Sequence, residues 1–341
     1  MATRHRYRKH LKHRKVGKHS RKHFRKHPRK HSRKTFSRKN HRKRNKGHSR
    51  RVMGGGILDD LIIPNSSASD IPLLGRLLGS GEYKNTYDLD TNKVIQVMGE
   101  NQSITLIDIP YIKNEINAWK AAGDHPYVCT LYNIFIHDDK IYFICEKSIY
   151  GNKQCVDLRC VLQNKDTCSK QPSNWKGLFD AVKYLHDKGF THRDIKPDNI
   201  LVKNPCHFLL SDFGLANISK LTAGTTEYIP RYLYELKDKG TEYKVEYGIF
   251  HDIYSLGISI YETFHKLNSL PKIVSQIGEP IDESYKLRIT PDNYEISLIE
   301  DIKQIDDNNV KTLLNDLLKY SPNLTIDTAL EYKYFNIPTS Q

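Results

Sequence analysis

The uneven distribution of charge constrains the folding of this 341-residue chain more than any other feature. Residues 1–51 contain 24 Lys or Arg and no Asp or Glu, whereas the rest of the chain contains 30 basic and 39 acidic residues. A segment with dense like charge and almost no apolar side chains cannot offset the entropy that it loses on ordering. We therefore expect a disordered basic tail over residues 1–53, a linker over residues 54–70, and a folded region beyond it.

Composition also bears on where the chain resides. No run of about 18 apolar residues is present, as a transmembrane helix requires, and the N-terminus is too polar for a signal peptide. The six cysteines show no metal-binding spacing, so we expect reduced thiols and an intracellular, non-secreted protein. The alternative is cross-linking among the closely spaced Cys155, Cys160 and Cys168 in an oxidising setting.

The hydrophobic pattern changes from strands to helices along the folded region. Ile112, Ile116 and Trp119 share one face of a helix expected over Pro110–Ala122. Residues beyond Gly151 are mainly helical in pattern. A further helix is expected over Trp175–His186. The expected strands are Leu73–Leu78, Asn85–Leu89, Val94–Met98, Cys129–Ile136 and Ile141–Glu146. A small β-rich part with one main helix is thus followed by a larger helical part.

The strongest chemical signal is the segment from His192 to Asn199, HRDIKPDN, followed by Asp212-Phe213-Gly214. Phosphoryl transfer from ATP needs a carboxylate that orients the attacking hydroxyl and accepts its proton. It also needs oxygen ligands for Mg²⁺, which neutralises charge on the phosphates. The two segments contain residues of both kinds, in an order that chance rarely produces.

HRDxxxxN followed by DFG resembles the catalytic core of the eukaryotic-type protein kinases. The resemblance covers about residues 71–335 and implies an α+β, bilobal kinase fold, with an N-lobe over 71–146 and a C-lobe over 147–341. It implies ATP and Mg²⁺ as cofactors and protein hydroxyls as substrates. Asp194 is then the catalytic base, Asn199 and Asp212 are the metal ligands, and Lys196 is typical of serine/threonine kinases.

Further residues match the nucleotide-binding half of that family. Leu78-Gly79-Ser80-Gly81 resembles the glycine-rich loop, in which backbone N–H groups approach phosphates. Glu115 matches the glutamate of helix αC, and Glu146 lies in the segment that matches the adenine-binding hinge. The resemblance implies nucleotide contacts from Leu78, Gly79, Ser80, Gly81, Lys84, Thr86, Gln96, Glu146 and Leu201.

One expected residue is missing. The family places a lysine on the third strand, where it holds the α/β-phosphates and pairs with the αC glutamate, but this chain has Gln96 there. Lys93 is three residues away and points to the opposite face of the strand. Lys84 stands at the third glycine position of the loop, as in the with-no-lysine kinases. We hypothesise that Lys84 replaces the missing lysine and approaches Glu115; the alternative is a pseudokinase scaffold.

The larger lobe carries additional family features. His192 and Phe213 match the hydrophobic stack that links the lobes, with Trp119 as a third member, and Asp252 matches the aspartate that anchors the catalytic loop. Arg231 replaces the glutamate of the family's APE motif, and its usual arginine partner is replaced by Leu324, which we interpret as structural drift. In the activation segment, Arg193 is expected to gather a phosphate from Ser219 or Thr222, and Thr225 to contact Asp194 and Lys196.

The basic tail contains a four-residue repeat over Ser20–Thr35. Its charge favours non-specific binding of nucleic acid through residues 1–51 and is compatible with nuclear targeting. Binding to an anionic membrane surface is a less favoured alternative. Its hydroxyls, interleaved with Arg-Lys pairs, are also possible phosphorylation targets of the domain. Another alternative is a nucleic-acid-packaging protein with a secondary kinase domain. The tail and the Lys-, Asn- and Ile-rich core are similar in style to kinases of large DNA viruses, which would add the virion to the expected locations.

Overall fold

The structure is a computed structural model that describes residues 71–81, 83–123, 125–151, 155–265 and 300–336. The predicted tail over residues 1–53, with its repeat, and the predicted linker over residues 54–70 lie outside these residues. Within the described part of the chain, no helix combines the length and apolar character that crossing a bilayer requires.

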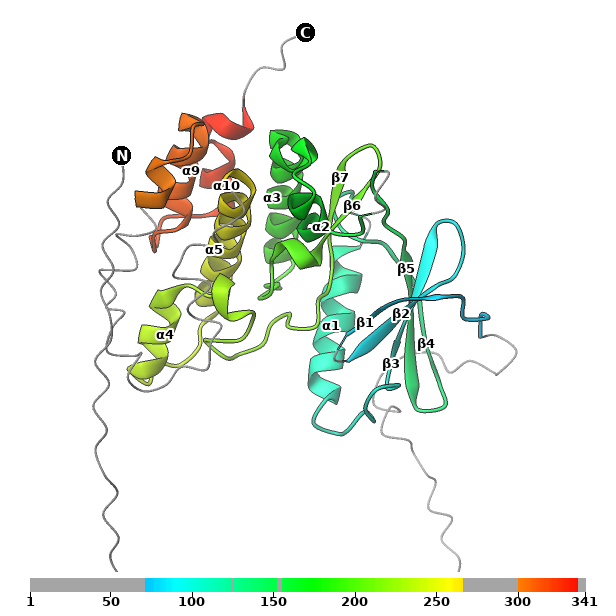
Figure 1. Ribbon diagram of the computed structural model, residues 1–341. Coiled ribbons are helices and arrows are strands. Elements are labelled where there is room, and N and C mark those ends of the chain that lie inside the picture. Colours follow the sequence, from blue (N-terminus) through cyan, green and yellow to red (C-terminus); the bar gives the residue numbers. More distant parts are fainter. Residues whose placement is uncertain (1–70, 82, 124, 152–154, 266–299, 337–341) are drawn as a thin grey trace, which may run out of the picture. The chain divides into compact units, whose positions relative to one another are not determined.

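The N-terminal part is a five-stranded antiparallel sheet in the order β1-β2-β3-β5-β4 (Figure 1). The prediction for the first strand is wrong in position, because Leu73 is exposed and pairing begins at Leu77, opposite Tyr87. The other strands agree with prediction to within two residues. The bounds are β1 Leu77–Ser80, β2 Lys84–Asp88, β3 Lys93–Met98, β4 Leu131–His137 and β5 Lys140–Glu146.

Both faces of this sheet are covered, which explains its apolar central strands. On β3, Val94 and Met98 belong to the main core, while Ile95 and Val97 belong to a separate cluster on the other face. Helix α1 (Ile109–Ala122) begins with a proline in its first turn and contributes its apolar face to the main core. The alternation on β3 therefore assigns each of its side chains to one of two faces.

The C-terminal part is helical apart from the hairpin of β6 (Ile200–Lys203) and β7 (His207–Leu210). Helix α5 is its centre, contacts both α3 and α9, and is buried on nearly all sides (Figure 1). Together with the sheet this confirms the α+β kinase fold. The helices are α2 Leu158–Gln163, α3 Pro172–Asp187, α4 Arg231–Asp238, α5 Val245–Phe264, α9 Asn308–Leu317 and α10 Ile326–Leu330, with short 3₁₀ turns η3 Thr167–Lys170, η4 Pro197–Asn199, η5 Thr226–Tyr228 and η6 Lys333–Phe335.

The expectation of uniformly reduced thiols is wrong for this structure. Cys155 is bonded to Cys160, and Cys168 is bonded to Cys206, with Cα–Cα distances of 5.4 and 5.9 Å. The second bond joins η3 to the β6–β7 turn across 38 residues, a pairing that no local spacing reveals. The two remaining cysteines are free and buried.

Candidate active site

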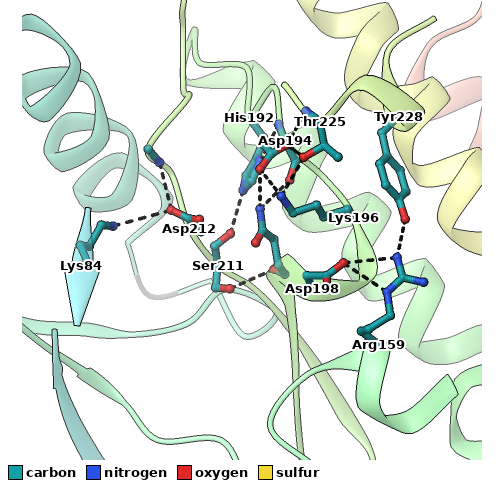
Figure 2. Close-up of polar contacts among 12 residues, drawn as sticks. Lys84, Arg159, His192, Asp194, Lys196, Asp198, Ser211, Asp212, Thr225 and Tyr228 are labelled. Atoms are coloured by element: carbon teal, nitrogen blue, oxygen red, sulfur yellow. Dashed lines mark hydrogen bonds and ion pairs between the residues drawn. The ribbon is translucent and has the colours of Figure 1, made fainter. Parts of the chain in front are cut away.

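Asp194 lies at the centre of a dense hydrogen-bond network in the loop before η4 (Figure 2). Its Oδ1 accepts hydrogen bonds from the Thr225 backbone N–H (2.9 Å) and hydroxyl (2.7 Å), and its Oδ2 accepts from Lys196 Nζ (2.8 Å) and Asn199 Nδ2 (2.9 Å). Lys196 also donates to the Thr225 hydroxyl, at 2.7 Å. The contacts predicted for Thr225 are therefore present.

The ionisation of Asp194 follows from these neighbours. Burial by itself raises the pKa of Asp194, but the Lys196 ammonium and the hydrogen bonds from Thr225 outweigh it and hold the pKa below its ordinary value. The carboxylate is therefore charged at neutral pH and can act as a hydrogen-bond acceptor for an incoming hydroxyl.

The loop that carries Asp194 is anchored by hydrogen bonds to Asp252 on α5. Its two carboxylate oxygens accept hydrogen bonds from the backbone N–H groups of His192 and Arg193, both at 2.7 Å, and His186 Nε2 lies 2.9 Å away. Although burial opposes ionisation, the adjoining His186 lowers the pKa of Asp252. A fully buried carboxylate thus fixes the backbone of the two residues that precede the candidate base, as the family resemblance implies.

Lys84 at the start of β2 forms an ion pair with Glu115 of α1. Its Nζ also lies 3.6 Å from Oδ1 of Asp212, and Figure 2 shows it directed toward that carboxylate. Burial by itself lowers the pKa of Lys84, but the Glu115 and Asp212 carboxylates outweigh this and raise the pKa above its ordinary value. The ammonium is therefore charged, and the pairing hypothesised from the sequence is present.

The register of the sheet explains how Lys84 reaches this position. Thr86 pairs with Gln96, and Lys84 pairs with Met98, so all four side chains lie on the face that joins the main core. Lys93 lies on the other face, where its Nζ is 5.2 Å from the ring centre of Tyr132. Lys84 thus stands on the same face as the position where a third-strand lysine is expected, displaced by two residues.

A continuous row of aromatic side chains connects this face to the catalytic loop. Phe143 of β5 stacks on Trp119 of α1, Trp119 stacks on Phe213, and Phe213 contacts His192, with ring-centre separations of 6.0, 5.9 and 5.1 Å. The three members predicted from the sequence are in contact. Phe143 was not predicted, because one apolar residue in a strand carries no signal for this role.

Two hydrogen bonds join the chain segments that carry the candidate metal ligands. Ser211, which precedes Asp212, donates both its backbone N–H (3.0 Å) and its hydroxyl (2.9 Å) to the carbonyl of Asn199. The Asp212 side chain is half exposed, and its backbone has a φ of +61°. An amide and a carboxylate are oxygen donors of the kind that Mg²⁺ takes together with phosphate oxygens.

The region expected to bind nucleotide fits a phosphate-bearing ligand. The β1–β2 turn is closed by the Gly81 N–H, which donates to the Lys84 carbonyl at 2.8 Å, and a Cβ on Gly79 would meet nothing within 4 Å. Leu78 and its neighbours on β1 are exposed. Open backbone beside a charged ammonium suits polyphosphate. Thr86 and Gln96 lie on the same sheet face.

Two other predicted nucleotide contacts belong to the lobe junction. The Glu146 carboxylate pairs with Lys203 and accepts a hydrogen bond from the Thr130 hydroxyl at 3.2 Å. That side chain is therefore engaged within the protein. Leu201 on β6 is partly buried against the main core.

The predicted role of Arg193 as a phosphate receptor is wrong for this conformation. Its side chain is fully buried and donates to His251 Nδ1 (3.0 Å) and to the carbonyls of Ile218, Lys220 and Leu221 (3.0, 2.7 and 3.1 Å). The activation segment thus supplies backbone oxygens where a phosphate on Ser219 or Thr222 was expected.

The arginine that replaces a glutamate at the start of α4 lies near a carboxylate of the same helix. Arg231 lies 3.6 Å from Glu235, one turn further along the same helix. Leu324, in the place of the family's arginine, packs against the main core. Both members of the usual buried pair have changed. The Arg231 Nε is buried and has no hydrogen-bond partner among the described residues, and structural drift stays an interpretation.

Comparison with known proteins assigns the family. The model of the protein kinase domain matches residues 74–335. The chain belongs to the protein kinase family. It is similar to the CBL-interacting serine/threonine-protein kinase 8 of Arabidopsis thaliana, with 30% identity over 204 residues. It is also similar to human 3-phosphoinositide-dependent protein kinase 1, with 27% identity over 202 residues, and to the serine/threonine-protein kinase PKH2 of Candida albicans, with 27% identity over 212 residues.

These similarities cover part of each chain. Each covers 55% of this chain, but 42%, 34% and 21% of the three relatives, respectively. The chain therefore spans less than half the length of the curated relatives that it matches. The stylistic resemblance to viral kinases stays a prediction.

Proposed function

We propose that this chain is a serine/threonine protein kinase that transfers the γ-phosphoryl group of ATP to protein hydroxyls. The observation that carries the proposal is the charge arrangement on the two sides of the site. Asp194 is an ionised acceptor surrounded by Lys196, Asn199 and Thr225. Opposite it, Lys84 is a charged donor paired with Glu115 and Asp212.

The proposed mechanism assigns one task to each group. Asp194 orients the substrate hydroxyl and accepts its proton as the oxygen attacks phosphorus. Lys196, already bonded to Asp194, stabilises the developing negative charge. Lys84 would hold the phosphates of the nucleotide in place of the missing third-strand lysine, and Asn199 and Asp212 would hold Mg²⁺. When bound, Mg²⁺-ATP supplies the phosphoryl group and its leaving group.

The pseudokinase alternative predicts that no phosphate is transferred. We would incubate the full chain with radiolabelled ATP, Mg²⁺ and a peptide array, beside Asp194→Asn and Lys84→Met variants. Lys93→Met is the matched control, because that lysine lies on the other sheet face, over Tyr132. Transfer by the wild type and Lys93→Met, with loss in the other two, supports the proposal. Equal signals in all four proteins would refute it.

We also propose that residues 1–51 bind nucleic acid or another polyanion. The support is the count of 24 Lys or Arg without a carboxylate, since neutralising phosphates releases counterions. Affinity for generic duplex DNA is then expected to fall by about 10³-fold or more between 50 and 200 mM salt. Binding should survive Asp194→Asn and disappear when residues 1–51 are deleted. Tight binding by the deleted form would contradict this assignment and favour a site on the domain.

A further inference from the structure

Arg159, in the first turn of α2, joins three separate elements beside the catalytic loop. Its guanidinium donates to Glu262 on α5 at 2.5 Å, to the Tyr228 hydroxyl in η5 at 2.6 Å, and to Asp198 in η4 at 3.2 Å. Tyr228 in turn donates to Glu262 at 2.5 Å. Figure 2 shows Asp198 between the Asp194 network and Arg159. No sequence motif marks this arginine.

These groups line a cavity that opens at the reaction centre. The cavity has a volume of about 430 Å³, and its lining includes Lys196, Asn199 and Thr225, the three residues hydrogen-bonded to Asp194. Arg159 and Glu262 belong to the same lining. A substrate whose hydroxyl reaches Asp194 must place a neighbouring side chain at this cavity, because extended residues are only about 3.3 Å apart.

The cavity is acidic without its arginine. Asp198, Glu227 and Glu262 contribute carboxylates to its lining. The Glu262 side chain is only 2% exposed, and burial raises its pKa even with the guanidinium adjacent. A carboxylate buried this deeply needs a cation as its partner. In this chain the cation is Arg159, whose own side chain is 23% exposed and so faces the cavity.

We infer that Arg159 occupies the place that a basic side chain of the substrate would otherwise take in this cavity, and that it is a specificity-determining residue. The inference rests on the proposed kinase function. With Arg159 present, Glu262 and one oxygen of Asp198 are already satisfied. A substrate arginine at the matching position then gains no partner for those groups and meets a like charge. Without Arg159, the Glu262 carboxylate has no cation from the enzyme, and a basic side chain of the substrate can supply one.

The test uses serine peptides in a neutral background, in which one arginine is placed in turn at each of five positions on either side of the serine. The full-length wild type, Arg159→Met and Arg159→Met/Glu262→Gln are compared for kcat/KM and for peptide affinity by calorimetry. Lys183→Met, at an exposed pair on α3, is the control for loss of a positive charge elsewhere. Thermal unfolding shows how much folded protein each sample contains.

We expect the wild type and the Lys183→Met variant to show no gain from arginine at the position that reaches the cavity. Arg159→Met should gain at least about tenfold in both measurements at that one position, since a buried charged pair is restored. The double variant, which lacks both members of the pair and is expected to fold normally, should lose most of the gain.

A purely structural role for Arg159 predicts a different outcome. Arg159→Met would then change kcat/KM and affinity by the same factor for every peptide, in parallel with its loss of stability. That result would overturn the inference. Persistence of the full gain in the double variant would also overturn it, because Glu262 would not be the receptor. If no protein transfers phosphate, the proposed function fails, while calorimetry still decides whether peptide selectivity has shifted.

Discussion

The pair of Lys84 and Glu115 allows stability and catalysis to be measured separately. Glu115 is 2% exposed, and its partner's side chain is 15% exposed. In Lys84→Met the carboxylate loses its counter-ion, which costs about 3–5 kcal/mol for a buried pair. For a domain of this size that loss lowers the Tm by roughly 6–15 °C. The loss should shrink toward pH 5, because burial raises the pKa of Glu115 and the unpaired carboxyl then takes up a proton.

The double variant Lys84→Met/Glu115→Gln removes both charges and should recover most of the lost stability. It should not recover phosphotransfer, because the cation proposed to act on the phosphates is still absent. Loss of one such charged contact lowers the rate by about 10²–10³-fold or more. Denaturant unfolding gives the free energies, and initial rates at saturating ATP give the activity. A double variant that regains activity together with stability would refute a catalytic role for Lys84.

Three further predictions follow from the buried contacts of the larger lobe. The Ser219→Ala/Thr222→Ala variant should keep activity within about twofold of the wild type, since Arg193 is already bonded by backbone carbonyls; loss of activity would restore the phosphate-receptor role. Burial and the adjacent guanidinium lower the pKa of His251 from 6.5 to about 3, so acid favours the unfolded state, which alone takes the proton. The wild type should therefore lose about 2 kcal/mol more stability than His251→Asn between pH 7 and pH 5; equal losses, measured by urea unfolding, would contradict this. Cys168→Ser should lower the free energy of unfolding by about 3–4 kcal/mol under non-reducing conditions, because its disulfide closes a loop of 38 residues, and the difference should vanish in reductant.

The parts of the site that the sequence located share one property: the chemistry fixes both residue type and spacing. Asp194, Asn199 and Asp212 are proposed as the base and the two oxygen ligands in this way, since such residues recur at set intervals in the family. The switch between strand and helix periodicity indicated a β-rich part followed by a helical part, and the family resemblance implied the kinase fold. Lys84 was a harder case, because it was identified only from the paired observation that Gln96 stands where a lysine was expected.

The features that the sequence missed depend on distant pairings. Arg159 meets Glu262 across 103 residues, and no local spacing connects an arginine on α2 with a glutamate on the buried helix α5. Only the tertiary structure, in which α2 lies against η4 and the Arg159 side chain reaches α5, brings them together. The wrong role predicted for Arg193 has a similar origin. A buried arginine takes whatever acceptors the tertiary structure supplies, and here the activation segment supplies three backbone carbonyls.

The role proposed for Lys84 implies one constraint on this site. Under that proposal the site requires one cation on the sheet face that carries Lys84, next to Glu115 and Asp212, and the register places both Lys84 and Gln96 on that face. A shift of two residues keeps a side chain on the same face, whereas a shift of one or three, as for Lys93, reverses it. The flexible lysine stem covers the displacement of roughly 7 Å along the strands. A double variant that moves the lysine back, Lys84→Met/Gln96→Lys, should therefore regain part of the activity that Lys84→Met loses. A folded double variant that regains no activity would contradict this requirement.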